Sequence, residues 1–257
     1  MLLGLLYRLY EGRLLRRLRG GPLPRHVGLI LDGNRRYAQE ASLTSRDAYE
    51  RGADKVDDVL EWCETLNIPQ VTVWVLSIEN LERPPEEILP LLEVIEQKIK
   101  RLARHPATVR CKRRIRAVGH FDALPGSLRR AIADAEQATA GYSGCVLNIA
   151  VGYGGRQEIA DAVRSLVQAH FRPGITAEDL TAYLTPEEIG RHMYTGAVDD
   201  PDLIIRTSGE TRLSGFLLWQ SVYSEYYFCD VYWPMFRRVD FLRALRSYQQ
   251  RQRRFGR

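Results

Sequence analysis

The sequence predicts one α/β domain with a mainly parallel central sheet covered by helices, and three observations favour this fold class. Short apolar runs without polar alternation recur along the chain, which is typical of parallel strands buried on both faces. Apolar stripes with helical spacing lie between these runs. The 257 residues suffice for one large core, and no Pro-, Ser- or Gly-rich linker divides them.

The predicted elements alternate in the order that builds such a sheet. Strands are expected at residues 27–31, 71–76, 115–118, 146–151 and 203–206, with a short one near 227–229. Helical stripes run over residues 49–63 and 88–102, and a long last helix is expected from 241 to 254.

An N-terminal extension, residues 1–23, precedes the expected catalytic domain at 24–257. Its first 18 residues interleave leucines with arginines, and two arrangements fit this pattern. The segment could lie on a membrane surface as a basic amphipathic helix, or pack its leucines on the domain or on a dimer partner. No long apolar run and no signal-peptide cleavage site is found, so a cytoplasmic location is expected, with or without peripheral membrane contact.

The charge balance is basic, with a net charge of +5. Only four of the 37 basic residues are lysines, and arginine suits bidentate phosphate binding, although a GC-rich genome explains most of the excess. No basic stripe with aromatic residues or RNA-binding module is found, so no nucleic-acid partner is expected. The four scattered cysteines have neither metal-ligand spacing nor a disulfide framework.

A strand that runs into an acid, a tight turn and two arginines is the most informative feature. Asp32 follows the first apolar run, Gly33 and Asn34 permit the turn, and Arg35 and Arg36 add positive charge. This pattern predicts a phosphate and metal site. The alternative is an ordinary strand-to-helix turn with a capping acid.

Two further strands also end in polar loops. The run at 203–205 leads into Arg206, Arg212 and Ser214, and the run at 71–76 leads into Ser77, Asn80 and Arg83. The carboxyl ends of parallel strands lie at one edge of a sheet, so these loops are expected to form one shared site. Nucleotide-binding motifs of the GxxxxGK[ST] and GxGxxG types are absent, which argues against nucleoside triphosphates and dinucleotides.

The motifs HVGLILDGNRR, SIENLER, GYGGR and IIRTSGETRLSGFLLWQSVYSEYYF occur in this order, and their spacing resembles that of the cis-prenyltransferases, the undecaprenyl-diphosphate-synthase-like enzymes. The similarity runs from Pro24 to the C-terminus. It implies a homodimeric α/β enzyme that condenses isopentenyl diphosphate with an allylic diphosphate to form a Z double bond, using Mg²⁺. The ending Arg254-Phe255-Gly256 resembles the RxG terminus that some members extend into the neighbouring active site, and residues 201–228 would lie near the dimer interface.

The resemblance also implies roles for individual residues. Asp32 would hold the metal, with help from Glu225 near the dimer interface; one or two carboxylates suffice for Mg²⁺. The allylic diphosphate would be held by Gly33, Asn34 and Arg36. The isopentenyl diphosphate is assigned to Arg206, Arg212 and Ser214. Ser77 and Asn80 would lie near the reacting ends, although both could simply cap a strand end. The remaining substrate-binding candidates are Arg35, Tyr37, Arg46 and Arg83.

Departures from the family pattern point to a short product. Tyr37 and Leu81 replace tryptophans, and Ser45 and Tyr49 stand where an arginine and a histidine are usual, with Arg46 as the candidate replacement. Val75 replaces a small residue and, with Leu81 and Leu147, would narrow the path of the growing tail. The expected product is therefore C15, (Z,E)-farnesyl diphosphate made from geranyl diphosphate.

Four alternatives to this function remain open. Val75 could be only a β-branched core residue, and the product could be a longer decaprenyl or undecaprenyl chain. The enzyme could instead couple its units irregularly. An accessory subunit without activity is the non-enzyme alternative, but Asp32, Arg36, Arg206 and Arg212 argue against it.

Overall fold

The computed structural model describes residues 2–196 and 198–251, without the side chains of residues 2–6 and 8. One six-stranded, all-parallel sheet forms its centre, in the order β3-β4-β2-β1-β5-β6. The strands are β1 (His26–Ile30), β2 (Gln70–Ser77), β3 (Arg113–Val118), β4 (Cys145–Tyr153), β5 (Leu203–Arg206) and β6 (Glu225–Phe228). The predicted fold class is confirmed. The last strand begins two residues earlier than expected.

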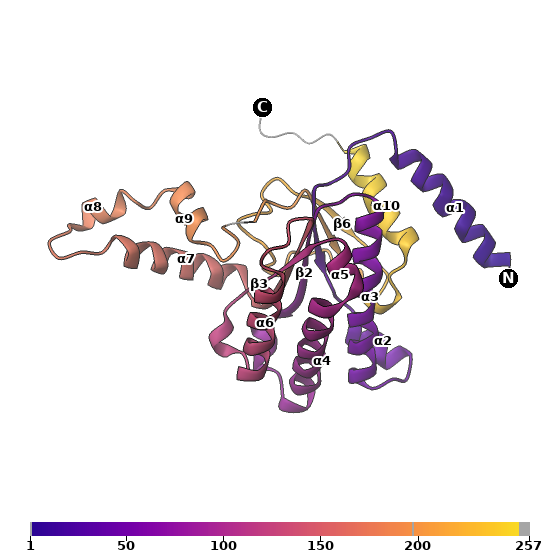
Figure 1. The fold of residues 1–257 in the computed structure, drawn as a ribbon, viewed down its shortest axis with the longest axis horizontal. Helices are drawn as coiled ribbons and strands as arrows, with labels where there is room; N and C mark the ends of the chain where they lie inside the picture. The colour runs from indigo at the N-terminus through magenta and orange to yellow at the C-terminus, as the bar shows by residue number, and fades with distance from the viewer. Residues whose placement is uncertain (1, 197, 252–257) are drawn as a thin grey trace.

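Helices cover the sheet, with α3, α4 and α6 side by side in Figure 1 and α10 near α3. The helices are α1 (Leu2–Leu18), α2 (Asn34–Glu40), α3 (Ser45–Thr65), α4 (Pro85–Arg104), α5 (Pro106–Arg110), α6 (Gly126–Thr139), α7 (Gly155–His170), α8 (Ala177–Thr181), α9 (Pro186–His192) and α10 (Arg238–Gln250). Helices α7 to α9 project from the sheet as an arm. The expected last helix begins three residues earlier than predicted, and the RxG ending lies outside the described residues.

Local signals explain where the two helices beside β2 begin. Thr44 and Asp47 form a reciprocal capping box at the start of α3. Pro85 occupies the first turn of α4, where its missing N–H costs nothing. Both helices start at the carboxyl edge of the sheet and run back along it, so their first turns border whatever that edge binds.

The second half of α1 packs against α10. Leu14 and Leu18 are buried, and the Gln249 amide donates a hydrogen bond to the Leu18 carbonyl (3.0 Å). The guanidinium of Arg243 lies 5.3 Å from the centre of the Tyr10 ring, a cation–π contact. This half of the segment therefore packs on the domain, which is one of the two predicted arrangements.

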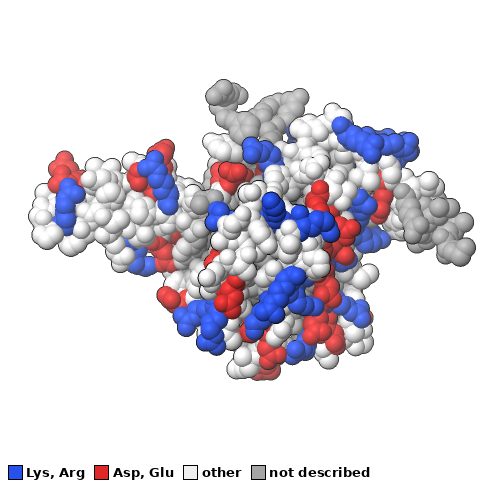
Figure 2. Space-filling model, viewed as in Figure 1, with Lys and Arg blue, Asp and Glu red and all other residues white. Residues whose placement is uncertain are grey.

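The surface carries both signs of charge. Figure 2 shows acidic and basic side chains interspersed over the face formed by α3, α4 and α6. Ion pairs such as Arg46–Glu93 (2.6 Å) join neighbouring helices there. Within the described part of the chain, no helix combines the length and the apolar character needed to cross a membrane.

Candidate active site

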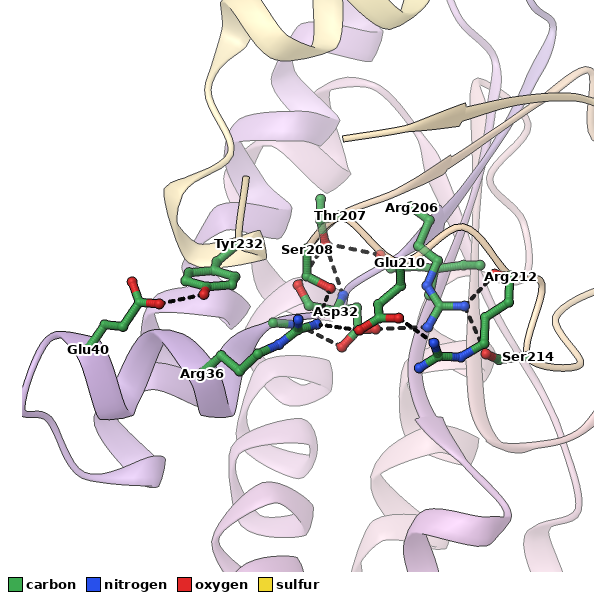
Figure 3. Close-up of polar contacts among 12 residues, drawn as sticks. Asp32, Arg36, Glu40, Arg206, Thr207, Ser208, Glu210, Arg212, Ser214 and Tyr232 are labelled. Atoms are coloured by element: carbon green, nitrogen blue, oxygen red, sulfur yellow. Dashed lines mark hydrogen bonds and ion pairs between the residues drawn. The ribbon is translucent and has the colours of Figure 1, made fainter. Parts of the chain in front are cut away.

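Asp32 and Arg206 meet at the carboxyl edge of the sheet, just beyond β1 and at the end of β5. One carboxylate oxygen of Asp32 accepts a hydrogen bond from Arg206 Nη2 at 2.9 Å (Figure 3). The Arg206 side chain is only 4% exposed, whereas that of Asp32 is 33% exposed. Thr207 fixes the backbone between them, because its hydroxyl donates to the Asp32 carbonyl at 2.7 Å. The Asp32 carboxylate is thus partly exposed to solvent, while the Arg206 side chain that holds it is buried.

The turn after Asp32 requires glycine. Gly33 has φ of +100°, and a Cβ there would lie 2.7 Å from the Tyr232 ring and 2.9 Å from Ser208 Cβ. Its N–H donates to the second Asp32 oxygen at 2.7 Å. No L side chain adopts this conformation easily, so the sequence Asp-Gly fixes how the carboxylate is presented.

Arginines surround this carboxylate. Arg36 Nη2 donates to the Ser208 hydroxyl (2.6 Å) and pairs with Glu210 at 3.2 Å, while its guanidinium lies over the Tyr232 ring. Glu210 also pairs with Arg212, whose side chain is 64% exposed. Figure 3 shows Arg36, Glu210 and Arg212 arranged around Asp32. Arg206 thus pairs with Asp32, while Arg36 and Arg212 pair with Glu210 beside it, and such a group of arginines is suited to diphosphate oxygens.

The groups border a polar cleft of about 710 Å³. Its lining is formed by Leu31, Asp32, Gly33, Asn34, Arg35, Arg36, Ala38, Gln39, Leu43, Ser45, Tyr49, Val75, Asn80, Arg83, Glu87, Leu91, Glu210 and Arg212. Burial and the nearby Arg35 lower the pKa of Arg83, whereas Tyr49 and Glu87 oppose this shift. Burial also raises the pKa of Tyr49, so its hydroxyl stays protonated at neutral pH. The cleft thus offers the guanidinium group of Arg83 and the protonated hydroxyl of Tyr49 as hydrogen-bond donors for an anion.

Three buried polar atoms near the cleft lack a hydrogen-bond partner among the described residues: the amide oxygen of Asn34, the hydroxyl of Tyr49 and Nε of Arg206. The Asn34 side chain donates to the Leu31 carbonyl at 2.9 Å, and its oxygen fills the space beside Gly52 of α3. Unpartnered buried polar atoms are rare in folded proteins and often belong to a site that acts on a ligand.

A second, apolar cavity of about 70 Å³ adjoins the polar cleft, since Leu31, Asn34, Tyr49, Val75 and Leu91 line both. It lies between the sheet and helices α3 and α4. The rest of its wall consists of Gly52, Ala53, Val56, Val73, Val94, Ile95, Lys98, Ile99, Leu102, Ile149 and Trp233. A polar head and an apolar tail of one substrate would therefore find adjoining sites.

Most predicted site residues come together at this edge. Asp32, Gly33, Asn34, Arg35, Arg36, Asn80, Arg83 and Arg212 line the cleft. Arg206 joins them from behind, since its Nη1 donates to Ser214 Oγ (2.8 Å) and to the carbonyl of Arg212. Ser77, at the end of β2, accepts the N–H of Asn80 on its Oγ at 3.2 Å, in the short helix η1 (Glu79–Glu82).

Two candidates, Tyr37 and Arg46, lie outside the cleft lining. Tyr37 accepts a hydrogen bond from Arg51 (2.6 Å), and Arg46 pairs with Glu50 and Glu93 on the exposed side of α3. Neither residue lines the cleft, whereas Ser45 and Tyr49 do. Arg46 therefore does not take the place of the arginine that is usual in the family.

Glu225 lies at the amino-terminal end of the parallel strands, away from the carboxyl edge that holds Asp32. It begins β6, in register with Leu203 at the start of β5, whereas Arg206 ends that strand. Three residues of strand correspond to roughly 10 Å. Glu225 pairs with Arg251 at 2.9 Å. The described chain therefore does not bring Glu225 to Asp32.

The three residues expected to limit product length have different positions. Val75 lines both the polar cleft and the apolar cavity. Leu147 is fully buried, in register with Val71 and Ile115 farther from the carboxyl edge. Leu81 packs against the core from η1. Among the described residues, neither of these leucines lines the cavity.

Sequence reasoning missed several supporting residues. Thr207, Ser208 and Glu210 followed a predicted strand, so their position was a usable signal. Tyr232, which packs on both Gly33 and Arg36, had no local signal, because it belongs to a loop before α10. The same holds for Gly52, which lies within the apolar stripe of α3.

Comparisons with known proteins give this site its context. A family model described as "Putative undecaprenyl diphosphate synthase" matches residues 30–256. The chain is 52% identical over 252 residues to the (2Z,6E)-farnesyl diphosphate synthase of Thermobifida fusca, covering 98% of this chain and 97% of that protein. It is 50% identical over 257 residues to the geranylgeranyl-diphosphate-specific tritrans,polycis-undecaprenyl-diphosphate synthase of Methanopyrus kandleri, covering 98% and 91%.

A solved structure agrees in fold. The lavandulyl diphosphate synthase of Lavandula x intermedia, in complex with dimethylallyl diphosphate, matches with a TM-score of 0.81 and 31% identity, covering 91% of this chain and 99% of that one.

Fold and site define an α/β enzyme with an arginine-rich cleft at the carboxyl edge of a parallel sheet. The chain belongs to the undecaprenyl diphosphate synthase family of cis-prenyltransferases, as its motifs predicted.

Proposed function

We propose that the protein condenses isopentenyl diphosphate with geranyl diphosphate, forming the C15 product (Z,E)-farnesyl diphosphate and releasing diphosphate. One observation carries this proposal: an arginine-rich cleft of about 710 Å³ opens onto an apolar cavity of only about 70 Å³. A cavity of that size favours a short prenyl tail over a long one. The similarity to a (2Z,6E)-farnesyl diphosphate synthase supports the same length.

Different residues of the cleft would bind the two diphosphate groups. Arg36 and the turn at Gly33–Asn34 would hold the allylic diphosphate, beside the mouth of the apolar cavity. Arg206, Arg212 and Ser214 would hold the diphosphate of the isopentenyl unit. As the allylic C–O bond breaks, a new C–C bond forms to the isopentenyl unit, which loses a proton. Asn80, whose side chain borders the cleft, would orient the reacting groups.

Mg²⁺ fits the residues at this site. Asp32 offers a partly exposed carboxylate, and a hard cation that keeps several waters needs only one or two carboxylates besides substrate phosphates. Asp32 would hold the ion together with diphosphate oxygens. When bound, Mg²⁺ would neutralise the charge that develops on the leaving diphosphate.

A homodimer is also part of the proposal. Val222 (70% exposed), Tyr223 (58%) and Phe228 (36%) form an apolar surface beside the edge strand β6. An uncovered parallel edge with apolar neighbours is typical of an interface. Peripheral membrane contact would involve the free side of α1, where Leu9 is 63% exposed. Light scattering in solution and vesicle flotation test these two assignments.

The decisive experiment is incubation with isopentenyl diphosphate and dimethylallyl, geranyl or farnesyl diphosphate, with and without EDTA. Geranyl diphosphate should give a C15 product with one new Z double bond, and EDTA should abolish the reaction. Products of C50 or longer would instead assign the long-chain activity, and a branched product would assign irregular coupling.

A further inference from the structure

The apolar cavity contains one charged residue among the described residues that line it, Lys98 of α4. Helices α3 and α4 both run away from the polar cleft. Lys98 follows Leu91, which borders the cleft, by seven residues of α4, about 10.5 Å along the helix axis. Val56 of α3 follows Tyr49 by the same interval. Lys98 and Val56 therefore lie two helical turns deeper than the cavity mouth.

Lys98 is held in place by Asp57 of α3. The distance from Lys98 Nζ to the Asp57 carboxylate is 2.6 Å. The Lys98 side chain is 9% exposed and that of Asp57 is 38% exposed. Lysine often places its aliphatic stem along apolar surface while its ammonium group reaches a polar partner. The stem thus forms cavity wall, and the charge is fixed between the two helices.

This pair resists displacement for a physical reason. Burial lowers the pKa of Lys98, and the hydrogen bond that its ammonium donates to Asp57 opposes that shift, so the ammonium depends on its partner. Moving Lys98 aside would leave a buried charge without its carboxylate. A neutral, flexible side chain could change rotamer instead, as Met commonly does.

We propose that Lys98, fixed by Asp57, is a specificity-determining residue that narrows the deep half of the cavity and limits the prenyl tail to that of a C15 product. This inference rests on the proposed function, of which it specifies the tail site. Val75 narrows the cavity at its mouth and Lys98 narrows it in its deep half, where Leu102 lies one turn farther along α4, so a smaller side chain at either position should admit a longer tail.

Product analysis is the first test. With geranyl diphosphate as starter, Lys98→Met should lengthen the product by at least one five-carbon unit, whereas Lys98→Arg should keep the wild-type length. Arg101→Met is the matched control, because the Arg101–Asp54 pair (3.6 Å) also joins α3 and α4 but does not line the cavity. If Lys98→Met is folded and active but makes the wild-type product, the inference is overturned.

Binding without turnover separates this inference from the proposed function. Calorimetry with C15 and C20 prenyl diphosphates, in the absence of isopentenyl diphosphate, should show C20 binding wild type about tenfold more weakly than C15. Lys98→Met should abolish this difference. Should Lys98→Met fail to fold, Asp57→Asn releases the ammonium with little change in shape and should have the same effect. Equal affinities for C15 and C20 in wild type would refute a limit on the tail at Lys98, even if the enzyme makes no C15 product.

Discussion

Three groups hold Asp32, and each acts on a different part of the residue. Arg206 balances its charge, Thr207 fixes its backbone and the N–H of Gly33 orients its second oxygen. The carboxylate is thus preorganised before any substrate arrives, as a ligand for the proposed Mg²⁺, which would neutralise the charge that develops on the leaving diphosphate.

Replacing Asp32 should therefore remove activity without unfolding the protein. We expect Asp32→Asn and Asp32→Ala each to lower kcat by at least about 100-fold, roughly 2.7 kcal/mol of transition-state stabilisation. Steady-state kinetics measure the loss, and circular dichroism confirms the fold. Asp54→Asn, an exposed carboxylate of α3, is the control. A variant of Asp32 that keeps a tenth of wild-type kcat would exclude Asp32 as the metal ligand.

The two arginines assigned to isopentenyl diphosphate should behave differently. Arg212 is largely exposed, so Arg212→Ala should leave the melting temperature unchanged. It should weaken the binding of isopentenyl diphosphate by about 1.5–3 kcal/mol, which raises KM for this substrate. Arg206 is buried against Asp32, so Arg206→Ala should also lower the melting temperature. Kinetics and thermal melts distinguish the two. A higher KM for the allylic substrate alone would mean that the two diphosphate subsites are exchanged.

At this scale the sequence was informative where a polar residue directly follows a strand. Asp32, Arg206 and Asn80 could be found in that way, because parallel strands share one edge. Tyr232 could not be found, since its contact with Gly33 depends on where the chain returns about two hundred residues later. Arg46 illustrates a further limit, because one position along a helix decides between the cleft and the exposed face.

Between elements, the fit of α2 against α3 depends on Gly52. A Cβ at this position would lie 2.4 Å from the Asn34 amide oxygen and 3.1 Å from the Trp233 ring. Alanine is normally favoured over glycine inside a helix by about 1 kcal/mol. Here the clash should offset that gain.

We therefore expect Gly52→Ala to lower kcat/KM for the allylic substrate at least about tenfold, because the added methyl group displaces Asn34 from the cleft. Its stability should stay within about 1 kcal/mol of wild type. Urea unfolding and steady-state kinetics test both values. Gly12→Ala, in the open on α1, is a control. Full activity of Gly52→Ala would show that Asn34 has no part in binding.

Val75 of β2 provides a second prediction at the level of elements. It lies at the boundary between the polar cleft and the apolar cavity, and Val75→Ala should widen that passage. The product distribution should shift by one or more five-carbon units. Val71→Ala, on the same strand but outside the cavity lining, should not change it. Chromatography of the products decides, and an unchanged distribution in an active Val75→Ala enzyme would contradict the assignment.

The six strands and the helices α3, α4 and α10 were predictable, because apolar runs and helical stripes report burial directly, whereas α5, α6, α8 and α9 were not among the predicted elements. The ends were less predictable. The start of α10 was missed at Arg238, because Arg237 and Asp240 cap it through a side-chain pair and not through an apolar residue. The contacts between α1 and α10 were left open, since an amphipathic leucine stripe fits a membrane and a protein surface equally well.

For the molecule as a whole, His26 couples stability to pH. It is buried at the amino end of the sheet, where its Nδ1 donates to the Asp199 carbonyl (2.6 Å) and its Nε2 bonds with the Thr72 hydroxyl (2.7 Å). Burial lowers the pKa of His26 from 6.5 to about 4. The folded protein thus holds this ring neutral in a range where the unfolded chain protonates it.

Stability should therefore be complete above pH 6.5 and fall as the pH decreases from 6.5 to 4, with a loss of about 3 kcal/mol attributable to His26. Urea unfolding at several pH values measures it. His26→Leu should be less stable at pH 7 but lose less on acidification, whereas His105→Leu, which removes the exposed cap of α5, should keep the acid-dependent loss of wild type. The same acid sensitivity in His26→Leu would assign it to other groups.

The position of β1 in the middle of the sheet also determines when the enzyme becomes complete during its synthesis. Asp32 is made early, but its partner Arg206 lies 174 residues farther along the chain. Strands β1 to β4 can associate while the ribosome is still adding residues, whereas β5 must close a very long loop onto the free side of β1. The nascent chain therefore has no functional cleft until nearly all of it has emerged, and until then β1 presents an open edge on which chaperones would act.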